Sequence, residues 1–384
     1  MIIDLPSTST VAVSKRLVRL RDDVGSMALG RVLTLIIVTD EEHVDDVVEI
    51  ANDASHQHPC RIITVVTANK RGAARLDAQI RVGGDAGASE VVLLRLYGAL
   101  AGQGRAVVTP LILPDSPVVV WWPHEAPRNP STDAIGAMGQ RRVTDAARAK
   151  SPKAELKRRR DTYVDGDTDL SWTRITLWRG LLAAALDQAP FEPVLSATVA
   201  GGSDSPSADL LAAWLAEYLR CPVTRARSRA GSGIVAVHLE RRTSSIDLVR
   251  PEGNTATLVQ KGHPDRKISL PPRSDAECLS DELRRLDPDE VYEATVTKGL
   301  ALLTLPSKTA SEVAAEGDML TPAEAKRIAD RLARENDARG SSAMVEADEP
   351  SDRADPEAVH EAATTKLAKK APAKAAARKA EDEE

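Results

Sequence analysis

Aromatic side chains are scarce in this sequence: five Trp, four Tyr and one Phe make up 3% of its 384 residues. Long apolar runs are also missing, because no stretch approaches the roughly 18 consecutive apolar residues that a membrane-spanning helix needs. The first residues, MIIDLPSTST, carry neither the charged end nor the apolar run of a signal peptide. We therefore expect a cytoplasmic protein that neither spans a membrane nor is exported.

Cysteine is equally sparse, with Cys60, Cys221 and Cys278 widely spaced and odd in number. This pattern predicts reduced thiols and not a disulfide framework. The segment HQHPC (56–60) offers two imidazoles and one thiol, but a structural zinc site needs four ligands and no second Cys/His pair stands nearby. Capping of a helix C-terminus is the better interpretation of these histidines, so no metal is expected.

No large excess of positive charge is present, since 51 Lys and Arg face 57 Asp and Glu, a net of −6. Residues 306–384 hold 13 basic and 18 acidic residues, so most of this charge belongs to the end of the chain. The near-neutral body argues against a primary role in nucleic-acid binding by phosphate neutralisation.

Apolar periodicity predicts the fold class. A 4-3-4-3 stripe from Val13 to Met27 indicates a helix, and apolar runs at 31–38, 61–66, 89–96 and 117–122 alternate with helical patterns. This order is typical of an α/β lobe with a mostly parallel sheet, which we place at residues 1–165 including a connecting segment.

A second lobe follows at residues 166–304. Helices are predicted at 171–187, 207–220, 275–286 and 288–299, and short alternating strands between 222 and 270 predict an antiparallel meander in an α+β arrangement. Residues 305–384 are rich in Ala and charge and are predicted to be a disordered tail with one short helix at 321–338.

Catalytic and cofactor motifs are missing. The stretch RVGGDAGAS (81–89) matches neither GxxxxGK[ST] nor GxGxxG, and a structural turn is the better interpretation. No GxSxG or local Cys/His signature points to a nucleophile. Asp165, Asp167 and Asp169 could serve acid–base chemistry, but their spacing also suits a turn and the N-cap of the next helix, which we favour. We therefore expect no enzyme activity and no cofactor.

The few aromatics are crowded, because six of the ten fall between 121 and 191. Strand alternation sends Trp121 and Trp122 to opposite faces, and Arg174 can stack on Trp178 at i,i+4. Trp, Tyr and Arg dominate interface hot spots, so this stretch predicts a binding surface. The alternative is that these tryptophans pack between the two lobes.

Several long blocks of the sequence resemble the bacterial glucose-6-phosphate dehydrogenase assembly protein family (OpcA). The resemblance runs in order over roughly residues 1–300. It is carried by GRVLTLIIV (30–38), ANDASHQHPCRIITVV (51–66), RLDAQIRVGGDAGASEVVLLRLYG (75–98), VVTPLILPDSPVVVWWP (107–123), RRVTD (141–145), GDTDLSWTRITLWRGLLAAALDQ (166–188) and ECLSDELRRLDPDEVY (277–292).

The resemblance implies an accessory protein that binds glucose-6-phosphate dehydrogenase, promotes its active oligomer and supports NADPH production by the oxidative pentose phosphate pathway. In photosynthetic relatives the effect is linked to thiol redox state, and this chain has no CxxC pair. From composition and motif position, the predicted partner-binding residues are Trp121, Trp122, Arg141, Arg142, Asp167, Asp169, Trp172, Arg174 and Trp178. Trp122→Ala and Arg174→Ala are expected to weaken activation of the dehydrogenase and leave the fold intact.

Two other functions fit parts of the sequence. A sugar-phosphate-binding or sugar-phosphate-converting α/β enzyme would use the amides near residues 83–87 together with the arginines. A nucleic-acid-associated protein would act through residues 366–379, which hold six basic residues and no acid.

Overall fold

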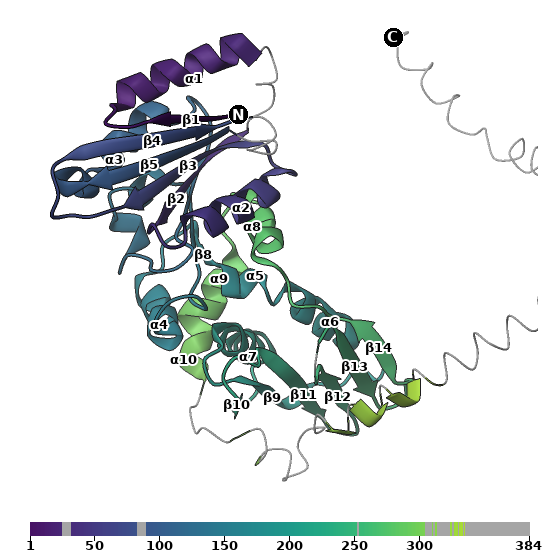
Figure 1. Cartoon of the computed structure of the whole chain (residues 1–384). Helices are drawn as coiled ribbons and strands as arrows, with labels where there is room; N and C mark the ends of the chain where they lie inside the picture. The colour runs from purple at the N-terminus through teal and green to yellow at the C-terminus, as the bar shows by residue number, and fades with distance from the viewer. Residues whose placement is uncertain are drawn as a thin grey trace, which may run out of the picture. The chain divides into compact units, whose positions relative to one another are not determined.

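Two β-sheets with helices packed against them make up the described part of the chain (Figure 1). The computed structural model describes residues 1–24, 32–82, 90–251 and 253–303, together with further residues between 309 and 334. The glycine-rich stretch at 83–87 and the basic segment at 366–379 lie outside the described residues.

The first sheet has eight strands, and six of them run parallel, which confirms the predicted mostly parallel sheet. At one edge β4 is antiparallel to β5, and β1 is antiparallel to β4. In order across the sheet, the strands are β1 (Ile2–Leu5), β4 (Arg75–Arg81), β5 (Glu90–Tyr97), β3 (Cys60–Thr67), β2 (Leu33–Thr39), β6 (Val118–Trp121), β7 (Arg141–Thr144) and β8 (Asp167–Asp169).

Helices cover both faces of this sheet, which explains why its central strands are apolar on both sides. On one face α1 (Thr10–Val24) and α3 (Gly104–Val108) pack against the sheet through Val13, Leu17 and Val108. The described part of the stripe predicted for the first helix, Val13, Leu17 and Leu20, therefore packs on the protein's own sheet.

The opposite face is covered by α2 (Val44–Ser55) and by α8 (Asp275–Arg284), which lie side by side although more than 200 residues separate them (Figure 1). Leu279 and Leu283 of α8 enter the same apolar cluster as Val47 of α2. The chain thus returns to its first sheet after it has built the second.

The second sheet has six strands and contains the predicted meander. Strands β11 to β14 are antiparallel neighbours in chain order, β9 is antiparallel to β11, and only β10 and β9 are parallel. In order across the sheet, the strands are β10 (Val223–Ser228), β9 (Val194–Gly202), β11 (Ile234–Arg241), β12 (Ser245–Val249), β13 (Thr255–Gln260) and β14 (Arg266–Ser269).

The remaining helices pack around this second sheet and beside it. The longest of them, α7 (Pro206–Leu219), is capped by Ser205, whose hydroxyl accepts a hydrogen bond from the Ala208 amide. The helices are α4 (Pro152–Thr162), α5 (Leu170–Thr173), α6 (Thr176–Leu186), α7 (Pro206–Leu219), α9 (Glu290–Ala294) and α10 (Leu300–Leu302), with a π-helical turn at Thr295–Gly299 before α10.

The helix predicted at 171–187 is broken into α5 and α6. The Thr176 hydroxyl donates to the Thr173 carbonyl (2.8 Å), and Ile175 adopts non-helical angles between the two helices. Its predicted broad burial is confirmed, because Trp172 of α5 enters the same core cluster as Trp178, Leu182 and Ala185 of α6.

The described residues between 323 and 334 are helical, within the segment for which a short helix is predicted. The rest of the tail lies outside the described residues, and the boundaries at 165 and 304 stay a prediction.

Candidate functional site

Arg141 and Arg142 are neighbours on β7 and bind carboxylates on different elements. Arg141 Nε donates to Glu282 Oε2 of α8 at 2.9 Å, and its Nη1 donates to the Asp287 carbonyl at 2.9 Å. Glu282 also accepts from the hydroxyl of Thr173. All of these side chains are buried, so the strand β7 is held to α8 by charge-assisted hydrogen bonds.

Arg142 pairs instead with Asp167 of the next strand, β8. Its Nη1 donates to the Gly139 carbonyl at 2.9 Å, and the Val164 amide donates to Asp167 Oδ2 at 3.1 Å. Burial raises the pKa of the Asp167 carboxyl, and the neighbouring Arg142 guanidinium opposes that rise. The pair therefore fixes the edge strand of the first sheet.

Asp169 ends β8 and caps α5, as the spacing of the three acids predicts. Its Oδ1 accepts from the Ser171 amide at 2.9 Å, and its Oδ2 accepts from the Thr144 hydroxyl (2.6 Å) and the Ala146 amide (2.9 Å). With all of these donors directed at it, the carboxylate is a structural cap that joins β7, β8 and α5.

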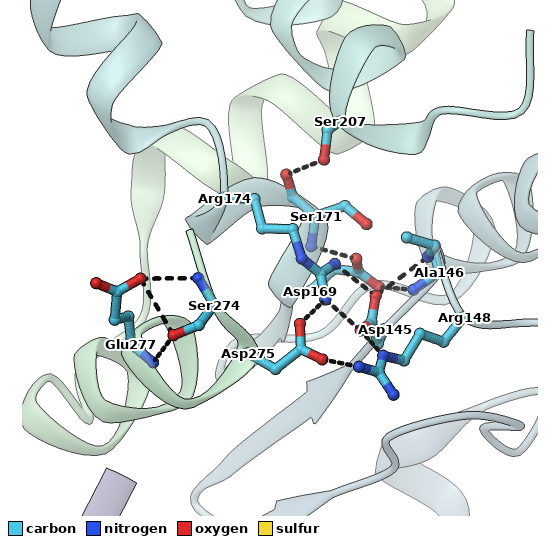
Figure 2. A network of polar contacts seen from close by, with 11 residues as sticks. Asp145, Ala146, Arg148, Asp169, Ser171, Arg174, Ser207, Ser274, Asp275 and Glu277 are labelled. Carbon is cyan, nitrogen blue, oxygen red and sulfur yellow. Dashed lines mark hydrogen bonds and ion pairs between the residues drawn. The ribbon is translucent and has the colours of Figure 1, made fainter. Parts of the chain in front are cut away.

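Arg174 lies at the centre of the network in Figure 2. It makes a two-pronged contact with Asp145, at 2.7 Å from Nη1 and 2.6 Å from Nη2, and its Nη2 also donates to Asp275 Oδ1 at 2.6 Å. Arg148 contacts the other oxygen of Asp275. Burial raises the pKa of Asp145, and Arg174 opposes this rise.

The four predicted tryptophans are all buried, at 3% exposure or less. Trp121 and Trp122 lie on opposite faces of the first sheet, as strand alternation predicts, and each fills a core cluster. Because Trp122 is buried, Trp122→Ala would create a cavity costing about 3–5 kcal/mol, so the expectation that it leaves the fold intact is wrong.

Trp172 and Trp178 each lie beneath an arginine, and the arginine over Trp178 is not the predicted one. Arg250, and not Arg174, lies over Trp178, at 5.3 Å from its ring centroid. Arg179 lies 3.6 Å over the ring of Trp172, whose indole N–H donates to Asp289 Oδ2 at 2.8 Å.

Above Trp172 is a cavity of about 560 Å³, which we call the Trp172 cavity. It lies between α5 and α6 on one side and α8 with the following loop on the other. The residues that line it are Arg141, Trp172, Thr173, Thr176, Arg179, Asp281, Glu282, Arg284, Arg285, Leu286, Asp287 and Asp289. Of the nine predicted residues it therefore brings together Arg141 and Trp172, whereas the other seven do not line it.

The arginines of the Trp172 cavity are only partly neutralised. Arg284 pairs with Asp281 at 2.9 Å, but within the described part of the chain no carboxylate lies within ion-pair distance of Arg179 or Arg285. Burial lowers the pKa of Arg179 to about 10, opposed by Asp289 and Glu282. Guanidinium groups without a carboxylate partner, such as those of Arg179 and Arg285 within the described part of the chain, are suited to bind carboxylates of another molecule.

Sequence reasoning missed the half of the site that comes from α8 and the loop after it. Glu282, Arg284, Arg285 and Asp289 all fall within residues 277–292, a block for which the sequence predicts two helices and a family resemblance but no site. Its density of acids and arginines is the one local signal. Two of these residues have partners more than 100 positions away in the sequence: Glu282 contacts Arg141, and Asp289 contacts Trp172.

The arrangement is better suited to contact than to catalysis. The carboxylates of Glu282 and Asp289 are occupied by arginine, threonine, indole and backbone donors, and the described lining holds no histidine or cysteine. Among the described residues no group of three or more His, Cys, Asp or Glu side chains is placed to hold a metal ion. A search of the described helices finds none that is long and apolar enough to cross a membrane.

Two family models match the chain one after the other. The glucose-6-phosphate dehydrogenase subunit N-terminal domain matches residues 51–161, and the C-terminal domain of the same subunit matches residues 165–296. Together they cover well over half of the sequence. The chain belongs to this family, the OpcA proteins. All nine predicted residues and most of the Trp172 cavity lining fall within the two matched regions.

A curated relative agrees with this assignment. The putative OxPP cycle protein OpcA of Synechococcus elongatus is 29% identical over 151 residues, which are 36% of this chain and 33% of that protein. The match thus spans about a third of the relative's length.

Solved structures are similar only at a low level. The 3-ketoreductase KijD10 from Actinomadura kijaniata has a TM-score of 0.42 and 9% identity over 72% of this chain and 98% of its own. Glucose-6-phosphate 1-dehydrogenase from Mycobacterium avium has a TM-score of 0.37 and 12% identity, covering 73% and 93%. Likenesses at this level support no conclusion about the function of this chain.

Proposed function

We propose that this OpcA-family chain is a non-catalytic accessory protein that binds glucose-6-phosphate dehydrogenase in the cytoplasm and promotes its assembly into the active oligomer. The observation that carries this proposal is the consecutive match of both subunit domains over residues 51–296. The curated relative is named for the oxidative pentose phosphate cycle, which supports a role in NADPH supply.

The Trp172 cavity is the surface we propose for the dehydrogenase. Its rim carries Arg284 and Arg285, both exposed, next to the partly buried Arg179 and Leu286. Arginines around an apolar centre are typical of interface hot spots, so we expect carboxylates on the facing surface of the partner.

The predicted residues behind the cavity then have a supporting role. Arg141 and Arg174 connect β7, α5 and α8 through buried ion pairs, which fixes the spacing of the cavity walls. A rigid surface loses little conformational entropy on binding, and this lowers the cost of association.

An activator acts only if it binds the competent form of its enzyme more tightly than the idle form. A tenfold shift between two assembly states requires about 1.4 kcal/mol of differential binding. One or two arginines that contact only the assembled dehydrogenase would supply this difference.

Titration of purified dehydrogenase with this protein tests the proposal. We expect specific activity to rise with added protein, together with a shift of the dehydrogenase to a larger assembly in light scattering. A titration that leaves activity, substrate dependence and oligomer mass unchanged would contradict it.

The alternative of a sugar-phosphate enzyme has less support. Its proposed amides at residues 83–87 lie outside the described residues, and the family match does not favour it.

A further inference from the structure

A second cavity, separate from the Trp172 cavity, lies between α4, β10 and the start of α7. Its volume is about 230 Å³, which is smaller than the roughly 300–1,000 Å³ typical of pockets for drug-sized ligands. Three leucines line it: Leu156 of α4, Leu300 of α10 and Leu303. We call it the α4–β10 cavity.

Positive charge from two elements converges on this cavity. Lys153, Lys157 and Arg160 recur at spacings of four and three, so they share one face of α4. Arg225 and Arg227 are two residues apart on β10, so they share one face of that strand. Both faces line the same cavity.

Among the described residues that line the cavity, one carboxylate faces these five cations, and it is already engaged. Asp209 of α7 accepts from Arg225 Nε at 2.7 Å, while the Nη atoms of Arg225 donate to the Gly201 and Gly202 carbonyls at 3.0 and 2.7 Å. This buried pair connects the end of β9 to α7. The Arg225–Asp209 pair is therefore structural. Because Asp209 is taken up by Arg225, the other four cations of the lining have no neutralising carboxylate among the described residues that line the cavity.

Of the remaining cations, Arg160 pairs with Asp161 at the protein surface. Lys153, Lys157 and Arg227 have no carboxylate within ion-pair distance among the described residues. Like charges at i,i+4 on a helix are unfavourable by a few tenths of a kcal/mol, and a concave site with one sign of charge concentrates the field.

We propose that the α4–β10 cavity binds the phosphate group of a small phosphorylated metabolite. The lysines of α4 and Arg227 of β10 approach the dianion from opposite walls, which suits the three-sided geometry of phosphate oxygens. The leucines contact the carbon skeleton. Gly299 allows the apolar wall to form, because a Cβ at this position would lie 2.4 Å from the Ala213 carbonyl oxygen of α7 and displace Leu300.

Thermal melting of the full chain with three probes at equal ionic strength tests this proposal. The probes are glycerol 3-phosphate, inorganic phosphate and glycerol. At ten times its dissociation constant, glycerol 3-phosphate is expected to raise the melting temperature by about 2–4 °C. Inorganic phosphate should have a smaller effect, and glycerol should have none. An equal effect of inorganic phosphate would overturn the metabolite assignment.

Substitutions of the cavity residues test whether the stabilisation by glycerol 3-phosphate comes from binding in the α4–β10 cavity. Lys153→Gln with Lys157→Gln should reduce the affinity for glycerol 3-phosphate at least tenfold, and Arg227→Gln should do the same from the opposite wall. The matched control, Arg242→Gln with Lys267→Gln, removes two exposed charges, one from the bend after β11 and one from β14, and should bind normally.

Because Lys153 and Lys157 are exposed, the double variant should melt without ligand at the wild-type temperature or slightly above it. If phosphate compounds stabilise all variants and the control equally, the effect is a general salt effect and the proposal is overturned. The assay uses this protein alone, so its outcome does not depend on the dehydrogenase.

Discussion

Arg141 and Glu282, which are 141 positions apart in the sequence, form a buried ion pair with Arg141 Nε and Glu282 Oε2 2.9 Å apart. The pair joins a strand of the first sheet to a helix that the chain adds only after it has completed the second sheet. The wall of the Trp172 cavity depends on this connection, because both residues line it.

We expect Arg141→Gln to lower the free energy of unfolding by about 3–5 kcal/mol, because it leaves the Glu282 carboxylate buried without its partner. Urea denaturation followed by tryptophan fluorescence measures the change. The control is Arg148→Gln, whose side chain is 39% exposed and whose loss should cost about 1 kcal/mol or less. Equal losses in the two variants would contradict the importance of the Arg141–Glu282 pair.

Arg284→Ala combined with Arg285→Ala should raise the concentration needed for half-maximal activation of the dehydrogenase about tenfold or more. Both side chains are exposed, and the Arg284–Asp281 pair is a surface contact, so the fold should remain stable. The control is Arg242→Gln with Lys267→Gln, which removes the same charge elsewhere. If the two double variants activate equally well, the Trp172 cavity is not the contact surface.

The pH dependence of stability should include a contribution from His238. Burial lowers the pKa of this imidazole, but its contacts with Asp247 (2.8 Å) and Glu240 (3.1 Å) outweigh burial and raise the pKa above 6.5. The charged contact therefore stabilises the fold fully below pH 6.5 and is lost as the pH rises through the folded-state pKa.

Comparison of wild type with His238→Gln by urea denaturation at pH 6 and pH 9 tests this sign. The difference in unfolding free energy should be larger at pH 6. A difference that is equal at both pH values, or larger at pH 9, would show that the protonated contact does not contribute.

The three cysteines should react slowly with iodoacetamide in the folded protein. Cys60 and Cys278 are buried, and burial raises the pKa of the Cys278 thiol to about 12. Cys221 is partly exposed, with its pKa also raised by burial. At pH 8 we expect slow labelling of Cys221 alone, and labelling of all three in urea, as measured by peptide mass spectrometry.

Rapid labelling of Cys278 without denaturant would reveal an opening of α8 from the first sheet. The expected protection argues that thiol redox chemistry does not regulate the folded form of this chain through Cys60 or Cys278.

Apolar strands and amphipathic helices could be predicted from the sequence because their signals are local. The runs at 61–66 and 117–122 became β3 and β6, with each bound shifted by one residue. Strands β7 and β8 were missed, since RRVT and DTD are polar. They are buried only because Arg142 and Asp167 neutralise each other and Arg141 pairs with Glu282.

The candidate site was predicted less well, because its contacts also join residues that are distant in the sequence. The crowding of Trp172 and Trp178 with arginines predicts a binding surface, and this stays a prediction. Local spacing could not show which partner each arginine takes. Arg174 contacts Asp145 and Asp275, which lie 29 and 101 positions away, and not Trp178 four positions on. Whether an arginine pairs with a carboxylate or stacks on an aromatic ring depends on which of them the fold brings close to it. The periodicity of the sequence does not contain that information.

The return of α8 to the first sheet also sets an order of events during synthesis. Domains generally fold from the N-terminus as the chain emerges from the ribosome. Here the apolar surface of α2 stays without its cover, and Arg141 without its counter-ion, until residue 284 has been made. A chain interrupted before that point therefore exposes the apolar surface of α2 and leaves the Arg141 guanidinium unpaired. Such a chain becomes a substrate for chaperones and proteases.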